Sequence, residues 1–390
     1  MPDQLFPGPG LLMLTTQTPI PCTQMRGGTS KGLYFLADDL PSEEALRDTI
    51  LLAVMGGPDD LQIDGVGGGH PLSSKVAIVS KSASPDAQVD YLFLQVSPAG
   101  GKVSTTQNCC NMLAGVGPFA IERGLVGAAE GETAVRVLMV NSGNICELTV
   151  STPGGRVEYE GDTSIDGVPG SAAPIICDYF DLAGSTCGAL LPTGNLIDDF
   201  DGVDATCIDN GMPVVTIRAT DLGISGYESA EELEQNRSLK EKLEHIREQA
   251  GPAMNLGDVK DKTVPKMSLL APPRDGGAIS ARTFIPHACH KTIGVLGAVS
   301  VATACIIPGS VAAKIAVVPD GDEKVMDIEH AAGSLQTRLV TETSASGIQV
   351  SRAGVIRTAR MLFAGFAYVP KSVWENRGEA DESQRIAANA

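Results

Sequence analysis

The amino-acid sequence predicts an α+β fold made of two similar domains, and three observations support this prediction. The chain has 390 residues, more than one hydrophobic core of ordinary size needs. Strand-like segments dominate each half, and each half contains one strongly apolar, helix-like segment. These two segments follow Cys109 and Cys289, which are 180 positions apart in the numbering. A spacing close to half the chain length indicates an internal duplication.

In the first half, we expect one early helix and a series of strands joined by tight turns. Ser42 begins a helix at 42–55, because acidic residues follow it, and Gly56-Gly57-Pro58 ends that helix. Turn sequences at 141–143 and 153–155 predict antiparallel pairing of the flanking strands. The expected strands are 20–25, 33–36, 76–79, 91–96, 135–140, 145–150 and 157–159.

The second half is predicted to repeat this plan. A charged amphipathic helix is expected at 228–250, and a short helix near 357–362. The expected strands are 214–218, 264–270, 315–318, 341–350 and 366–369. We therefore expect domains at 18–190 and 191–370, with flexible ends at 1–17 and 371–390.

The composition argues against several classes of partner and compartment. Apolar residues make up 43% and charged residues 19%, as in ordinary soluble proteins. A formal net charge of −18 argues against nucleic acid and anionic membranes as partners. No stretch approaches the roughly 18 apolar residues of a membrane span. The nine cysteines show no framework or metal-ligand spacing and no basic leader is expected, so we predict reduced thiols in a cytoplasmic protein without a metal site.

The glycine-rich loop at 26–32 contains two cations and two hydroxyls, supplied by Arg26, Thr29, Ser30 and Lys31. Such a loop suits the capture of an anion by backbone N–H groups and side chains together. The spacing of its glycines and lysine, and the strand that follows, exclude a nucleotide-binding P-loop. A plain hairpin turn is the alternative.

Lys75 begins the buried strand at 76–79, directly after a second glycine-rich loop at 64–72. Desolvation at such a position would lower the pKa of the amine, and a neutral amine can act as a general base. The alternative is a lysine on an edge strand whose amine reaches water.

Cys109 and Cys110 stand at the start of the apolar, helix-like segment of the first half. Unpaired backbone N–H groups and the helix dipole favour an anion at such a position. They can lower the pKa of a thiol or hold a substrate carboxylate. The alternative is that both cysteines are small buried hydrophobic residues.

Together these segments resemble the PrpF family, whose members have the diaminopimelate-epimerase fold. The matching segments are 25–32, 74–75, 108–111, 191–195, 209–213, 265–267 and 357–360. The resemblance implies two similar domains, each a curved, mostly antiparallel sheet around a central helix, with a cleft between them. It also implies cofactor-independent isomerisation or tautomerisation of a small anionic di- or tricarboxylate. Within the family, the matches favour 4-oxalomesaconate as the substrate over 2-methylaconitate.

The resemblance places the catalytic pair of the family at Lys75 and Cys109. Lys75 would be the general base and Cys109 a second acid/base or a positioning group. Helix N-termini and nearby polar groups would stabilise the dienolate that forms. The predicted substrate-binding residues are Arg26, Thr29, Ser30, Lys31, Ser74, Asn108, Asn111, Arg282 and His290.

Several alternatives stay open at this point. The family usually has glycine where this chain has Cys110, which leaves open which thiol faces the substrate. Arg282 is otherwise a structural ion-pair partner, and His290 a loop histidine. Cys289 lacks the asparagine that flanks Cys109, so we expect it to pack rather than react, and Lys266 is expected to be a structural mirror of Lys75. A homodimer is the expected assembly, and a non-catalytic accessory protein is the alternative function.

Overall fold

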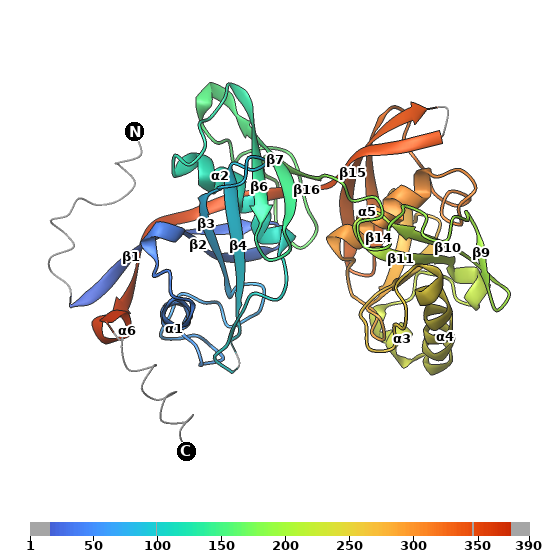
Figure 1. Ribbon diagram of the computed structural model, residues 1–390, viewed down its shortest axis with the longest axis horizontal. Coiled ribbons are helices and arrows are strands. Elements are labelled where there is room, and N and C mark those ends of the chain that lie inside the picture. Colours follow the sequence, from blue (N-terminus) through green and yellow to red (C-terminus); the bar gives the residue numbers. More distant parts are fainter. Residues whose placement is uncertain (1–15, 99, 345–346, 376–390) are drawn as a thin grey trace, which may run out of the picture. The chain divides into compact units, whose positions relative to one another are not determined.

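The computed structural model describes residues 16–98, 100–344 and 347–375, which fall into two compact units (Figure 1). The first unit comprises the chain up to Ser164, Gly170–Ile176 and the part from Arg357 onward, and the second comprises Ile165–Pro169 and Cys177–Ile356. The sequence placed the boundary at 190/191 and kept 357–370 in the second domain. The structure instead assigns 357–370 to the first unit, because this part of β16 (Gly347–Pro370) pairs with β1 (Gln17–Gly27).

A ring of eight strands forms the sheet that runs through the first unit. In order of neighbours, these are β1, β2 (Ser30–Leu36), β3 (Lys75–Lys81), β4 (Val89–Val96), β6 (Gly131–Met139), β7 (Asn144–Thr152), β8 (Pro174–Tyr179) and β16, which returns to β1. The short β5 (Val103–Ser104) pairs with β4. The helix α2 (Cys110–Glu122) contacts six strands of this ring and is its central helix. The predicted apolar helix after Cys109 is therefore confirmed.

Close packing of α2 against the ring requires glycine. A Cβ at Gly115 would lie 2.4 Å from the hydroxyl of Tyr34 on β2, and a Cβ at Gly117 would lie 2.8 Å from the side chain of Val150 on β7. On the other face of the sheet, α1 (Glu44–Met55) buries Ile50 and Leu51 against β1, β2, β3 and β4. The predicted helix at 42–55 is confirmed, and Gly56 ends it in the left-handed conformation.

The second unit repeats the order of elements found in the first. Its strands are β9 (Asp198–Phe200), β10 (Val203–Asp209), β11 (Pro213–Arg218), β12 (Lys266–Ala271), β13 (Ile279–Phe284), β14 (Glu323–His330), β15 (Gly333–Ser344) and β16. Its central helix α5 (Val295–Ile306) contacts β10, β11, β14 and β15. The helices α3 (Ala230–Gln235) and α4 (Arg237–Ala253) contribute to a second core, which lies against β10, β11, β12 and β13.

The pairing pattern supports the duplication inferred from the sequence. In the first unit β2 pairs in parallel with β3, and β4 in parallel with β6. In the second unit β11 pairs in parallel with β12, and β13 in parallel with β14, at the corresponding steps of the chain. The remaining ladders of known register are antiparallel. Each unit is thus a mixed sheet with a helix, and the predicted cleft between the two domains stays a prediction.

The structure corrects several local predictions. The expected helix near 357–362 is part of the strand β16, because pairing with β1 outweighs its helix-forming residues. The expected strands at 157–159 and 315–318 are irregular. The expected helix at 228–250 is two helices, because Asn236 ends α3 and its side chain caps α4 by accepting from Leu239 N–H. Of the ends expected to be flexible, Gln17 starts β1 and Lys371–Glu375 form α6, whereas 1–15 and 376–390 lie outside the described residues.

Short 3₁₀ helices at Ala37–Asp39, Pro153–Gly155 and Ala219–Leu222 complete the secondary structure. None of the helices in the described part of the chain is long and apolar enough to cross a membrane.

Candidate active site

The β1–β2 hairpin packs against the start of α2, which brings two of the predicted motifs together in the first unit. Asn111 Nδ2 donates a hydrogen bond to Thr29 Oγ1 at 3.1 Å. Gly28 has a φ of 50°, and a Cβ there would lie 2.2 Å from Asn111 Oδ1. Only glycine combines this left-handed turn with so close an approach. The glycine-rich loop is therefore a hairpin turn that is shaped to contact the helix start, and its predicted capture of an anion stays a prediction.

Cys109 is the N-cap of α2, and Cys110 is the first residue of the helix. The Cys109 carbonyl accepts hydrogen bonds from Leu113 N–H at 3.0 Å and from the hydroxyl of Tyr91 at 3.2 Å. Its side chain makes no cap hydrogen bond, so the thiol plays no part in holding the helix start. Cys109 is 9% exposed, whereas Cys110 is partly exposed.

Two buried tyrosines fix the backbone of this helix start. Tyr34 donates to the Met112 carbonyl at 2.6 Å, and Tyr91 donates to the Cys109 carbonyl. Burial raises the pKa of both phenols well above its ordinary value. Both hydroxyls therefore stay neutral hydrogen-bond donors at physiological pH.

Lys75 is the first residue of β3, an inner strand that lies between β2 and β4. Its side chain is nearly buried, with the residue 7% exposed, so it is not an edge-strand lysine that reaches water. Its Nζ donates to Gln95 Oε1 at 2.6 Å and lies 5.0 Å from the centre of the Phe93 ring. In the described part of the chain, no carboxylate forms an ion pair with Lys75.

Strand register shows which predicted residues share a face with Lys75. Gly32 pairs with Lys75 across β2 and β3, so both residues face the same side of the sheet. Ser30, two positions before Gly32, shares that face. Arg26 and Lys31 pair with each other and face the opposite side. Register therefore places these two cations on the opposite face from Lys75, and their predicted contact with the substrate stays a prediction.

Arg26 has a structural role that its contacts make plain. Its Nη1 donates to the Gly28 carbonyl at 2.9 Å, and to the carbonyl and hydroxyl of Thr358 at 3.0 and 2.9 Å. These bonds tie the hairpin to β16. Burial and the facing Arg360 lower the pKa of the Arg26 guanidinium. The backbone N–H of Lys31 donates to the Leu72 carbonyl, which joins the hairpin to the second glycine-rich loop.

Three buried polar atoms near these motifs have no hydrogen-bond partner among the described residues: Ser30 Oγ, Asn108 Oδ1 and Asn111 Oδ1. Burying such an atom unpaired costs about 1–3 kcal/mol. Ser74 differs, because its hydroxyl accepts from Gln62 Nε2 at 2.7 Å, and its predicted contact with the substrate stays a prediction. Unpaired acceptors and a donor gathered around the start of α2 are what a polar ligand would satisfy.

Sequence reasoning missed Phe93 and Gln95, which contact the Lys75 amine. Both lie on the predicted strand at 91–96, two positions apart, so strand alternation places them on one face. The missing information was the register that sets Gln95 opposite Lys75. The register between two strands depends on tertiary structure and cannot be read from a single sequence.

A family model described as PrpF protein matches residues 17–370. This chain belongs to the PrpF family. The (4E)-oxalomesaconate Delta-isomerase of Novosphingobium sp. (strain KA1) is 58% identical over 349 residues, which cover 90% of this chain and 97% of that protein. The 4-oxalomesaconate tautomerase of Pseudomonas putida is 55% identical over 358 residues, covering 92% and 98% of the two chains. Among solved structures, a methylitaconate-delta-isomerase is 33% identical, with a TM-score of 0.83 over 94% of this chain and 99% of that one.

The second unit holds the other two predicted binding residues of this family member. Arg282 is 7% exposed and donates from Nε to the Glu228 carbonyl at 2.7 Å and from Nη1 to the Ala281 carbonyl at 3.1 Å. Burial lowers the pKa of its guanidinium. The ring of His290 is exposed and bonds locally, with its Nδ1 accepting from Thr292 N–H at 3.0 Å. The predicted contact of these two residues with the substrate stays a prediction.

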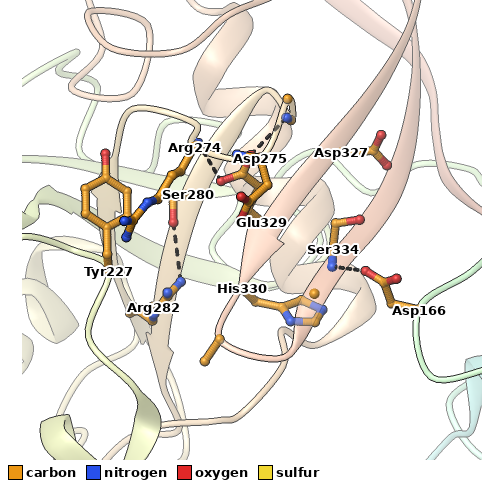
Figure 2. Close-up of a pocket in the computed structure, with 14 residues that line it drawn as sticks. Asp166, Tyr227, Arg274, Asp275, Ser280, Arg282, Asp327, Glu329, His330 and Ser334 are labelled. Atoms are coloured by element: carbon orange, nitrogen blue, oxygen red, sulfur yellow. Dashed lines mark hydrogen bonds between the residues drawn. The ribbon is translucent and has the colours of Figure 1, made fainter.

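Arg282 lines a polar cavity of about 630 Å³ within the second unit (Figure 2). Glu329 lines it too, and its carboxylate accepts three backbone N–H groups, from Arg274, Asp275 and Gly277. Among the described residues, no group of histidine, cysteine, aspartate or glutamate side chains is arranged to hold a metal ion.

The partial copy of the Cys109 motif differs in geometry. Cys289 lies several residues before α5, whose N-cap is Gly294, whereas Cys109 is itself an N-cap. Burial raises the pKa of the Cys289 thiol to about 11. Lys266 donates to the Thr263 carbonyl, and burial lowers the pKa of its amine. The Cys289 segment is thus a partial copy whose cysteine does not stand at the helix start, and the expectation that Cys289 packs rather than reacts stays a prediction.

Proposed function

We propose that this PrpF-family isomerase moves a proton within 4-oxalomesaconate, with Lys75 as the general base. The observation that carries the proposal is a nearly buried amine without a carboxylate partner in the described residues, set in the same unit as an N-cap thiol. The substrate is supported by the two relatives named for 4-oxalomesaconate, which are 55% and 58% identical to this chain. The relative named for methylitaconate is 33% identical.

The proposed chemistry is a proton shift without any change of oxidation state. Neutral Lys75 removes a proton from the carbon next to the conjugated system, so the C–H bond breaks, an N–H bond forms and the electron pair enters the dienolate. The ammonium then returns the proton to the oxygen or to a more distant carbon of the same system. Because electrons are neither gained nor lost, the proposal includes no cofactor.

Groups around the start of α2 would stabilise the anion formed in the first step. The backbone N–H groups of the first turn have no intrahelical acceptors, and the Cys109 side chain does not cap them. Ser30 Oγ is a buried hydroxyl free to donate to the dienolate. Cys109 is proposed as the second acid/base group, and Asn108 and Asn111 as further substrate contacts.

The partner and compartment follow as proposals of the same kind. The partner is a small anionic di- or tricarboxylate, since the chain carries a net charge of −18 and offers cations only locally. None of the nine cysteines, all of which lie in the described residues, forms a disulfide, and this supports the proposal of a reducing, cytoplasmic setting. A homodimer remains the proposed assembly.

The test is incubation of purified protein with 4-oxalomesaconate or 2-methylaconitate in D₂O, followed by proton NMR. We expect rapid conversion of 4-oxalomesaconate, with deuterium at the carbon that loses its proton, and slower or no conversion of 2-methylaconitate. Lys75→Ala should abolish this exchange and keep the wild-type melting temperature within a few degrees. Faster conversion of 2-methylaconitate would transfer the proposal to that substrate.

The same experiment distinguishes the isomerase from the alternative, a non-catalytic accessory protein. An accessory protein would leave both substrates unchanged in the absence of a partner enzyme. Near-normal turnover by a folded Lys75→Ala variant would refute the assignment of the base while leaving the isomerase activity in place.

A further inference from the structure

We propose that Gln95 is a positioning residue, which orients the Lys75 amine and receives it as an ammonium after proton abstraction. The inference rests on the proposed role of Lys75 as the base. Gln95 stands directly opposite Lys75 in the β3–β4 ladder, and its Oε1 accepts from Lys75 Nζ at 2.6 Å. It is the hydrogen-bond acceptor that the described residues provide for this amine.

The Gln95 amide is itself held by the backbone. Its Nε2 donates to the Ser74 carbonyl at 2.9 Å and to the Pro71 carbonyl at 3.2 Å. If the amide were turned over, its NH₂ group would face the Lys75 amine and its oxygen would face two carbonyl oxygens. The hydrogen bonds therefore fix the amide with its oxygen toward Lys75. Both carbonyls belong to the residues just before β3, so the loop, the amide and the amine form one connected unit.

Phe93 adds a second interaction that stabilises the ammonium form of Lys75. Its ring centre lies 5.0 Å from Lys75 Nζ, within range of a cation–π interaction. A carbonyl oxygen and a ring face both stabilise an ammonium more than a neutral amine. The substrate proton, once abstracted, is thus held on a nitrogen whose position Gln95 defines, from which it can be returned.

The other titratable groups on elements packed against β3 do not duplicate this role. The titratable side chains on the inner face of the sheet and at the start of α2 are phenols and thiols. They belong to Tyr34 of β2, Tyr91 of β4, the N-cap Cys109 and Cys110 of α2. Lys31 faces the other side of β2. No carboxylate of the described residues pairs with Lys75, so the Gln95 oxygen has no charged competitor.

The test compares Gln95→Glu with Gln95→Leu by the pH dependence of kcat. A carboxylate beside the amine stabilises the ammonium, so Gln95→Glu should move the acidic limb, along which kcat rises as the base loses its proton, to higher pH by about one unit or more. Gln95→Leu removes the acceptor, so the limb should move down and kcat on its plateau should fall about 10- to 100-fold, because the amine loses its orientation. KM should change less than threefold, since Gln95 acts through Lys75. Gln95→Asn, which keeps an amide but withdraws it, replaces the leucine variant if that one does not fold.

A second readout needs no substrate. NMR of lysine labelled with ¹³C and ¹⁵N, with the Lys75 signal assigned by its loss in Lys75→Ala, follows the titration of this amine directly. Opposite displacements in the two variants support the positioning role even if 4-oxalomesaconate proves not to be the substrate. If the Lys75 titration curves of both Gln95 variants coincide with that of wild type, the positioning role is refuted, even when the wild-type enzyme turns over normally.

Gln88 supplies the matched control. It lies just before β4, is exposed, and its Oε1 accepts from Arg136 N–H at 2.8 Å, far along the strand from Lys75. Gln88→Leu should leave kcat, its pH profile and the Lys75 signal as in wild type. A shift as large as that of Gln95→Leu would show that the effect is a general response of β4, and would contradict the proposal.

Discussion

Gly32→Ala should damage both stability and activity, because it places one methyl group between β2 and the base. Gly32 pairs with Lys75 in the parallel β2–β3 ladder. A Cβ at this position would lie 2.2 Å from the Lys75 carbonyl oxygen and 2.6 Å from Met112 Cε. Ordinary contacts of this kind are about 3.5 Å, so the β3 backbone must move by roughly 1 Å. The methionine can turn away, but the carbonyl cannot.

The expected magnitudes follow from that displacement. Overpacking a well-packed core costs about 1–3 kcal/mol, and each kcal/mol lowers the melting temperature of a domain of this size by about 2–4 °C. We therefore expect a fall of about 2–12 °C. A misplacement of about 1 Å at a catalytic group lowers turnover about 100-fold. The loss should appear in kcat, because the shifted group is the base.

The assay pairs differential scanning fluorimetry with turnover of 4-oxalomesaconate. Gly127→Ala is the control, since Gly127 has no positive φ and a Cβ there would meet nothing within 4 Å. This variant should match wild type in both measurements. If Gly32→Ala kept its melting temperature within 1 °C and its kcat within twofold, the claim that the β2–β3 contact sets the position of Lys75 would be refuted.

Two further predictions concern cysteines. Cys109→Ala should lower kcat about 100-fold, which is the range of a lost acid/base group. Cys110→Gly should cost about 1 kcal/mol of stability and little activity, because glycine weakens a helix. If steady-state kinetics showed the larger loss of kcat in Cys110→Gly, Cys110 would be the thiol that faces the substrate. Burial raises the pKa of Cys22 from 9.0 to about 11, so its neutral thiol contributes stability that is fully present below pH 9 and is lost as the pH rises to 11. Over that interval, urea unfolding should show wild type losing about 2–3 kcal/mol more than Cys22→Ala; equal losses would show that this thiol does not titrate with the fold.

Much of the local structure could be predicted because it depends on residues close together in the chain. The helix at 42–55 was readable from its acidic start and its Gly-Gly-Pro end, and α2 from the apolar run after Cys109. The duplication was visible in the spacing of Cys109 and Cys289, and the strand pairing repeats accordingly. The helix prediction at 357–362 was wrong, because pairing with a strand more than 300 residues away outweighs the local helix preference of this segment.

Residue types alone determined that this chain offers a lysine behind a glycine-rich loop and a cysteine at a helix start, and its motifs determined the family. Only the tertiary structure decided which side chains meet. Register put Gln95 and Phe93 on the Lys75 amine and turned Arg26 and Lys31 to the opposite face of the sheet. The physical reason is the two-residue period of a strand: a shift of one position exchanges the two faces, and the pairing that fixes the shift is made between distant segments.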